Sequence, residues 1–190
     1  LEALRRRQDQ VGDLARTLQR RLHELATLLE TSTAVVSSLD TEQVIDSILE
    51  QVQRLLGVDT CAVLLVDEET QQLRVHSSRG LSDRYVQELR LDPSPRELPA
   101  WRAIDSGQPV QIADVEKDRA MAGLLPLIRP EGYRSLLVVP LITLHGPPAV
   151  LVVYRADVHV FGSDEVNLAV TFANQAAMAL ENATLFSQTD

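Results

Sequence analysis

The chain has 190 residues, a length that fits one domain with appendages and leaves little room for a second full core. With 45% hydrophobic and 24% charged residues it has the composition of an ordinary soluble globular protein, and it contains no run of 18 apolar residues that could span a membrane. Its 18 basic and 27 acidic residues give a net charge of -9, which disfavours nucleic acid as a partner.

Residues 4–39 carry a heptad pattern that predicts a long helix paired with a second helix. With Leu4 at position a, eight of the eleven core positions are apolar, and Arg7, Arg21 and Ser32 are the exceptions. The eight are Leu4, Val11, Leu14, Leu18, Leu25, Leu28, Val35 and Leu39. At ~1.5 Å per residue the helix would be roughly 54 Å long, too long to bury its apolar stripe on a small domain. The alternative is an amphipathic helix that folds back on its own domain.

Residues 40–56 predict a second, buried helix. Asp40 and Gln43 resemble a capping box, and the apolar residues that follow have helical spacing up to the next glycine. Residues 60–66 are apolar without alternation, which is typical of a strand covered on both faces. A shorter strand over residues 73–76 would complete a hairpin.

Residues 80–133 differ from the rest in their many prolines and short helical pieces. Two such pieces are predicted, at residues 99–104 and 121–128. This part of the chain is interpreted as a variable, loop-rich cover for the sheet. Two strongly apolar strands at 135–142 and 149–154 then predict a second hairpin.

An alanine-rich helix closes the chain from Ser163 to about residue 187, with Ser163 as its N-cap. The element order predicts an α+β fold, in which an antiparallel sheet has helices on one face and the loop-rich cover on the other. The predicted domain boundaries are 1–39 for the coiled-coil helix and 40–187 for the body. A parallel homodimer is expected through the heptad residues and the closing helix. The residues of the closing helix that are expected in the dimer interface are Ala173, Ala177 and Leu180.

The second half of the body closely resembles a GAF domain. The resemblance rests on residues 132–141 (GYRSLLVVPL), 149–155 (AVLVVYR), Phe161, Asp164 and 172–183 (FANQAAMALENA). Together with the first hairpin it covers about residues 40–187. It implies a GAF/PAS-like sheet and a ligand-sensing or dimerising regulatory module. Such modules are usually attached to a histidine kinase or a related bacterial regulator, which implies a linked output domain beyond Asp190.

A weaker resemblance upstream concerns residues 9–16 (DQVGDLAR), which are similar to the start of the exit helix of a HAMP signal-relay domain. It implies that the native chain is the cytoplasmic part of a membrane-bound receptor. The single cysteine, Cys61, excludes an intrachain disulfide framework and a thiolate zinc site, and it favours a reducing cytoplasm.

The cofactors that GAF domains carry can be compared with the residues present. Bilin-binding members resemble one another in a Cys-His pair about nine residues before the glycine that matches Gly132. Gly123 and Leu124 stand at those places, so no covalent bilin is expected there. Cys61 is interpreted as a small buried hydrophobe. Haem is not expected either. It would need an axial ligand, and the only histidine near a plausible cavity is His76, at the end of a predicted strand, where histidines are far more often surface residues than ligands.

No metal-binding or catalytic motif is present in the sequence, so neither metal ligands nor an enzyme is predicted. Aromatic and guanidinium side chains between the sheet and its cover would suit a planar or anionic small molecule of unknown identity. The pocket candidates are His76, Arg79, Trp101, Arg129, Tyr133 and Arg134. The alternative is that Trp101 fills a small core of the cover and the arginines are solvated, which would leave a ligand-free dimerisation and relay module.

Overall fold

The computed structural model describes the backbone of residues 2–34 and 38–188, and the side-chain surroundings of residues 2–22 and 40–183. The chain divides into two compact units, residues 1–40 and 41–190. In the described parts, no helix combines the length and the apolar character needed to cross a membrane.

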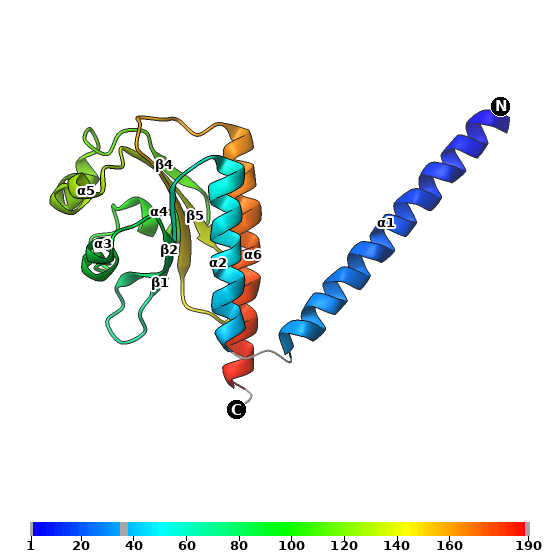
Figure 1. The fold of residues 1–190 in the computed structure, drawn as a ribbon, viewed down its shortest axis with the longest axis horizontal. Coiled ribbons are helices and arrows are strands. Elements are labelled where there is room, and N and C mark those ends of the chain that lie inside the picture. Colours follow the sequence, from blue (N-terminus) through cyan, green and yellow to red (C-terminus); the bar gives the residue numbers. More distant parts are fainter. Residues whose placement is uncertain (1, 35–37, 189–190) are drawn as a thin grey trace. The chain divides into compact units, whose positions relative to one another are not determined.

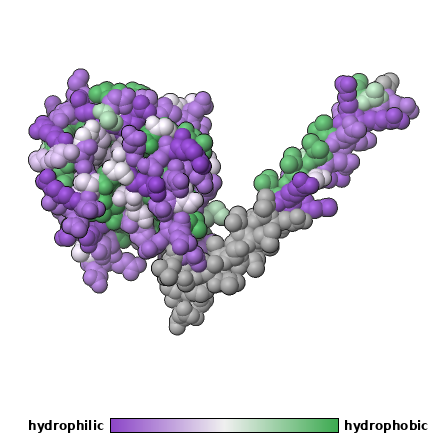
Figure 2. Space-filling model, viewed as in Figure 1, coloured by the Kyte–Doolittle hydropathy of each residue, from purple (hydrophilic) through white to green (hydrophobic). Residues whose placement is uncertain are grey.

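The first unit contains α1 (Glu2–Ala34), which follows the predicted helix over most of its length. Five large apolar residues on α1 are between 56% and 69% exposed, and hydrophobic colour runs along one side of the helix in Figure 2. They are Leu4, Val11, Leu14, Leu18 and Leu22. The remaining predicted seam residues lie outside the described side chains. These are Leu25, Leu28, Val35 and Leu39.

The second unit is built on a six-stranded sheet in the order β3-β2-β1-β6-β5-β4, with every neighbouring pair antiparallel. The strands are β1 (Thr60–Val66), β2 (Leu73–Arg79), β3 (Arg90–Leu91), β4 (Val110–Ile112), β5 (Ser135–Leu141) and β6 (Ala149–Arg155). The two predicted hairpins form the four middle strands. The edge strands β3 and β4 are only two and three residues long, too short to give a sequence pattern.

Helices cover both faces of this sheet. They are α2 (Ser38–Leu56), α3 (Asp83–Glu88), α4 (Pro99–Ser106), the 3₁₀ helix η1 (Arg119–Leu124), α5 (Leu125–Glu131) and α6 (Ser163–Gln188). Figure 1 shows α2 and α6 side by side on one face and α3, α4 and α5 on the other. The predicted α+β class is therefore confirmed. The start of α2 differs from the prediction by two residues, because Asp40 already lies in the first turn, where its charge favours the positive helix end.

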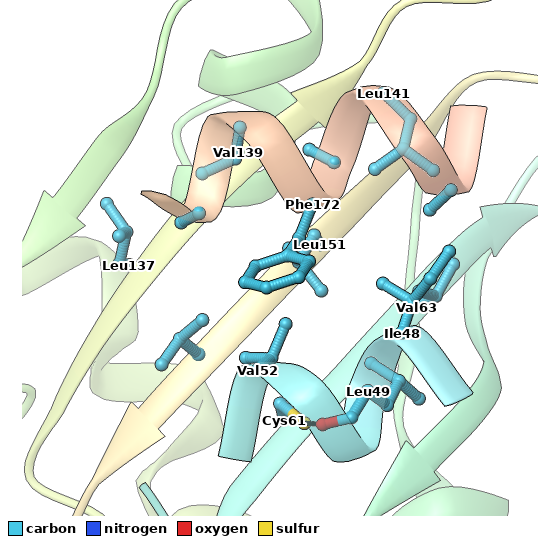
Figure 3. Packing of buried hydrophobic residues seen from close by; sticks show 14 of the residues in the cluster. Ile48, Leu49, Val52, Cys61, Val63, Leu137, Val139, Leu141, Leu151 and Phe172 are labelled. Atoms are coloured by element: carbon cyan, nitrogen blue, oxygen red, sulfur yellow. Dashed lines mark hydrogen bonds between the residues drawn. The ribbon is translucent and has the colours of Figure 1, made fainter. Parts of the chain in front are cut away.

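Alternate residues of the middle strands enter two separate cores. On the helix face, Val63 of β1 and Leu151 of β6 pack with Leu49 of α2 and Phe172 of α6 (Figure 3). On the other face, the neighbouring strand residues pack with Trp101 of α4. Burial on both faces explains why β1, β5 and β6 read as continuous apolar runs.

The alanine-rich side of α6 faces the sheet. Ala173, Ala177 and Leu180 are 0%, 5% and 8% exposed and belong to the core on the helix face. Small residues allow α6 to approach β5 and β6 closely, and this packing uses the apolar side of the helix. The position corrects the prediction that these three residues lie on an open dimer face.

Candidate functional site

A small cavity lies between the sheet and the cover. Its walls are almost entirely apolar and come from the sheet, α3, α4 and η1, with residues such as Leu64, Leu89, Leu98, Met121 and Val152. Its volume is about 40 Å³. That is enough for ordered water, whereas ligand pockets usually hold roughly 300–1,000 Å³. In this structure the cavity is closed to a ligand.

Three tyrosines meet at the cavity wall: Tyr85 of α3, Tyr133 just before β5, and Tyr154 of β6. The ring centroids of Tyr133 and Tyr154 are 4.6 Å apart, and Tyr85 meets these two rings edge-on at 6.0 and 6.4 Å. The hydroxyl oxygens of Tyr85 and Tyr133 are 2.7 Å apart, within hydrogen-bond distance. Burial raises the pKa of all three phenols, so each stays neutral and can donate or accept a hydrogen bond.

Local hydrogen bonds fix the positions of two of these tyrosines. At the start of α3 the hydroxyl oxygen of Ser82 accepts the Tyr85 N–H at 3.1 Å. The N–H and O–H of Ser82 both donate to Oε1 of Glu131 at the end of α5, at 2.8 and 2.7 Å. Gly132 then ends α5 with φ of 82°, a conformation that favours glycine, and Tyr133 follows directly. α3 and α5 are thus joined beside the cavity.

Replacing Tyr85 with phenylalanine tests this hydroxyl cluster. We expect the free energy of unfolding to fall by about 1–2 kcal/mol, because the buried Tyr133 hydroxyl loses its partner. Adding Tyr133→Phe should cost less than the same change in the unmodified chain, since that hydroxyl is then already unpaired. Urea unfolding of the two single variants and the double variant measures the coupling, and strictly additive losses would contradict it.

Of the residues predicted for a pocket, Tyr133 lines the cavity and Trp101 lies beside it. Trp101 is 2% exposed, and the guanidinium of Arg96 stacks on its ring at 4.2 Å from the centroid. Its indole N–H has no hydrogen-bond partner within the described part of the chain. Pro99 and Ala100, its neighbours in α4, line the cavity. Trp101 therefore fills the core of the cover, as the alternative interpretation of the sequence supposes.

The arginines of the cover bind carboxylates outside the cavity. The guanidinium of Arg134 donates to Asp114 at 3.0 and 3.1 Å, and Arg129 donates to Glu116 at 3.0 and 3.1 Å. The hydrogen bonds from Arg129 hold the pKa of Glu116 below its usual value. Neither arginine lines the cavity. This corrects the prediction of Arg134 as a pocket residue, because Asp114, twenty residues earlier, binds its guanidinium outside the cavity.

The other two candidates belong to β2. Arg79 donates to Asp46 and Gln53 of α2, which places it on the helix face of the sheet, opposite the cavity. His76 is exposed at the bulge where the pairing of β1 and β2 shifts register. Partial desolvation of the imidazole by the atoms around it lowers the pKa of His76, and the nearby carboxylate of Glu42 acts to raise that pKa. Neither residue contributes to the cavity wall.

Cys61 also lies on the helix face. Its thiol is buried and donates to the backbone carbonyl of Leu49 at 3.4 Å. Gly123 and Leu124, at the places of the bilin-attaching pair, belong to η1, and Leu124 lines the cavity. The one thiol of the chain is therefore separated from the cavity by the sheet.

We expect Cys61 to resist thiol reagents in the folded protein. Burial raises its pKa to about 12, so its thiolate fraction at pH 8 falls roughly a thousandfold below that of an ordinary cysteine. A disulfide reagent such as dithiobis-nitrobenzoate should react slowly with the native chain and promptly after denaturation in urea. Rapid reaction of the native chain would show that the thiol is accessible.

A second hollow opens at the surface between the end of α4 and the β5–β6 turn, with a volume of about 400 Å³. Asp105 is the only ionisable residue in its lining and already pairs with Arg96 at 3.2 Å. Among the residues described, no group of three histidine, cysteine, aspartate or glutamate side chains could hold a metal ion. The small cavity lined by Tyr85, Tyr133 and Tyr154, called the tyrosine cavity below, is therefore the better candidate for a binding site.

The antiparallel sheet, with α2 and α6 on one face and the covered cavity on the other, defines an α+β domain. The chain belongs to the GAF domain family, whose model matches residues 38–181. The resemblance predicted from the closing strands and helix is therefore confirmed. No curated protein matches the chain.

Solved structures with the same fold include three informative examples. The GAF domain of a phosphoenolpyruvate-protein phosphotransferase from Coxiella burnetii is 21% identical, with a TM-score of 0.68 over 84% of this chain and 93% of that one. A domain assigned to a two-component sensor histidine kinase of Sinorhizobium meliloti 1021 is 24% identical, with a TM-score of 0.65 over 78% and 97%. The blue-light absorbing form of the PixJ GAF domain from Thermosynechococcus elongatus is 17% identical, with a TM-score of 0.63 over 79% and 90%. These likenesses show the fold.

Proposed function

We propose that this chain is the regulatory sensor module of a signal-transduction protein and that it works as a parallel homodimer. Membership in the GAF family supports a regulatory role rather than a catalytic one. A linked output domain, as in histidine kinases or related regulators, would follow α6. The reducing setting favoured by the single cysteine supports a place in the cytoplasm, including the cytoplasmic part of a membrane receptor.

The main support for the proposed dimer is the stripe of exposed apolar residues on α1. Leu4, Val11 and Leu18 are all more than half exposed, although burial would stabilise each by ~25 cal/mol per Å². A second α1 can cover the stripe along its whole length, because a paired helix presents the same seam. The competing arrangement, in which α1 folds back on its own domain, can cover only part of so long a helix.

The solution mass tests this proposal directly. Analytical ultracentrifugation of the whole chain at micromolar concentration should give twice the mass of one chain. Dilution should shift the distribution towards the monomer. A single species with the mass of one chain at all concentrations would contradict the dimer.

For sensing, we propose that a small, largely apolar molecule with a hydrogen-bonding group enters the tyrosine cavity. The neutral hydroxyls of Tyr85, Tyr133 and Tyr154 would provide its polar contacts, since the rest of the wall is apolar. Because the cavity has a volume of only about 40 Å³, the parts of the cover that line it, α3, α4 and η1, must move outward for entry. The alternative function is a ligand-free dimerisation and relay module in which the cavity stays closed.

Trp101 distinguishes these two functions. The residue follows cavity-lining Ala100 in α4, so outward movement of the cover should change its fluorescence. A metabolite screen should find a compound that changes this fluorescence and raises the melting temperature. Its affinity should fall in Tyr133→Phe. A screen in which no compound does so favours the ligand-free module.

A further inference from the structure

The link between β3 and α4, residues 92–97, connects two parts of the cavity wall. Leu91, before the link, and Leu98, after it, both line the tyrosine cavity. The six residues between them are all exposed and contribute nothing to the lining. Residues 92–97 are called the strap below.

Arg96 attaches the strap to α4. Its guanidinium carbon lies 4.2 Å from the centroid of the Trp101 ring, and its Nη2 donates to Oδ1 of Asp105 at 3.2 Å. Trp101 and Asp105 both belong to α4. The Nη1 of Arg96 donates to the backbone carbonyl of Pro93 at 3.3 Å, within the strap itself. One side chain thus joins the strap to the helix and also fixes the conformation of the strap.

The contacts that hold the strap are individually weak. The side chains of Arg96 and Asp105 are each 47% exposed, and ion pairs with such exposure add little to stability. At the other end of the strap, Gln72 donates to Asp92 at 2.7 Å, and β3 pairs with β2 through only two residues. The strap can therefore detach without the loss of an extended ladder or of buried strap side chains.

The opposite side of the cover has more attachments. Ser82 at the start of α3 makes two hydrogen bonds to Glu131 of α5, at 2.8 and 2.7 Å. Arg129 of α5 makes two more to Glu116, at 3.1 and 3.0 Å. The strap is therefore the part of the cover that separates from its neighbours at the lowest cost.

The closed arrangement also leaves one buried polar group unsatisfied. The indole N–H of Trp101 has no hydrogen-bond partner within the described residues, and the residue is 2% exposed. A buried donor without an acceptor destabilises the state that contains it. Detachment of the strap uncovers the ring on which Arg96 stacks and gives water access to it. The open and closed arrangements are therefore closer in free energy than in a fully satisfied core.

We propose that the strap is a gate for the tyrosine cavity and that Arg96 holds it closed. This inference rests on the proposed sensing function, because a gate has a role only if a molecule enters. When the guanidinium leaves Trp101 and Asp105, the strap moves outward together with Leu98 at the start of α4. The route that opens lies between Leu91 and Leu98, and these apolar side chains suit the largely apolar molecule proposed above.

A thiol placed inside the cavity reports the opening in the whole chain. Ala100→Cys puts it on the cavity wall, at a position that is 4% exposed. The native Cys61 reacts slowly, because it is buried and its pKa is raised to about 12. Adding Arg96→Ala should raise the rate at which iodoacetamide labels the new thiol about tenfold, since the open state becomes more populated. Adding Arg102→Ala instead removes an exposed guanidinium from the same helix and should leave the rate unchanged.

A second thiol separates opening of the strap from unfolding of the domain. Ala173→Cys places it in the core on the helix face, at a position that is 0% exposed. Its labelling requires loss of the packing of α6, so Arg96→Ala should not change its rate.

Fluorescence gives a measurement that needs no new thiol, because Trp101 is the only tryptophan of the chain. Asp105→Asn removes the ion pair of Arg96 but leaves its guanidinium free to stack on the ring. If the ion pair helps to hold the strap closed, the quenching constant of Trp101 with acrylamide should rise about twofold. An unchanged constant would contradict a role for this pair.

The outcomes separate the gate from the function on which it rests. Faster labelling at position 100 alone supports the gate. Unchanged labelling at position 100 overturns it and leaves the sensing function standing, with entry past another part of the cover. Equal acceleration at positions 100 and 173 also overturns it, because Arg96 would then stabilise the whole domain. If the metabolite screen finds no compound that binds, the sensing function fails, and the gate fails with it.

Discussion

Replacing Leu18 with aspartate is expected to dissociate the dimer, with a rise in its dissociation constant of at least about 100-fold. Leu18 is 56% exposed in the single chain and occupies a central position of the α1 stripe. In a paired helix its side chain would leave water, so the variant must bury two carboxylates against each other or separate the helices. Sedimentation equilibrium over a range of concentrations measures the change.

The matched control is Gln19→Asp. It adds the same charge one residue along α1, at an exposed position off the seam, and should leave the dissociation constant nearly unchanged. Circular dichroism of both variants checks that the body remains folded. An equal effect of the two substitutions would show that net charge, rather than burial of the stripe, controls association.

Replacing Phe172 with alanine is expected to lower the free energy of unfolding by about 3–5 kcal/mol. Phe172 is 4% exposed and points from α6 towards the sheet, where it packs near Leu151 of β6 and Val52 of α2 (Figure 3). Removing the ring leaves a cavity between α6, β6 and α2. These elements cannot close the cavity without losing other packing contacts or strand hydrogen bonds. Phe172 thus holds α6 (Ser163–Gln188) on the sheet.

Asn174→Ala is the control for this change, since it removes an exposed side chain two residues further along the same helix. Its effect on the free energy of unfolding should stay within about 0.5 kcal/mol. Urea unfolding followed by circular dichroism gives both values. A loss below about 1 kcal/mol in Phe172→Ala would contradict the packing of α6 on the sheet.

The local pattern of the sequence determined the main elements and their layers. Residues 60–66 and 149–154 are predictable as strands because burial on both faces requires apolar residues at every position. The closing helix is predictable from its small residues, although Ser163, the predicted N-cap, is already the first residue of the helix. These signals depend on neighbours in sequence, so they can be read without coordinates.

The tertiary structure alone decided where the side chains point and what they bind. Arg134 stands next to a strand of the cavity wall, yet Asp114 binds its guanidinium outside the cavity. The three tyrosines come from separate elements, and nothing in their sequence spacing indicates that their rings meet. The composition of α6 likewise does not say which side of the helix faces the sheet. Such choices follow from contacts between residues that are distant in sequence, and those contacts exist only once the elements have packed.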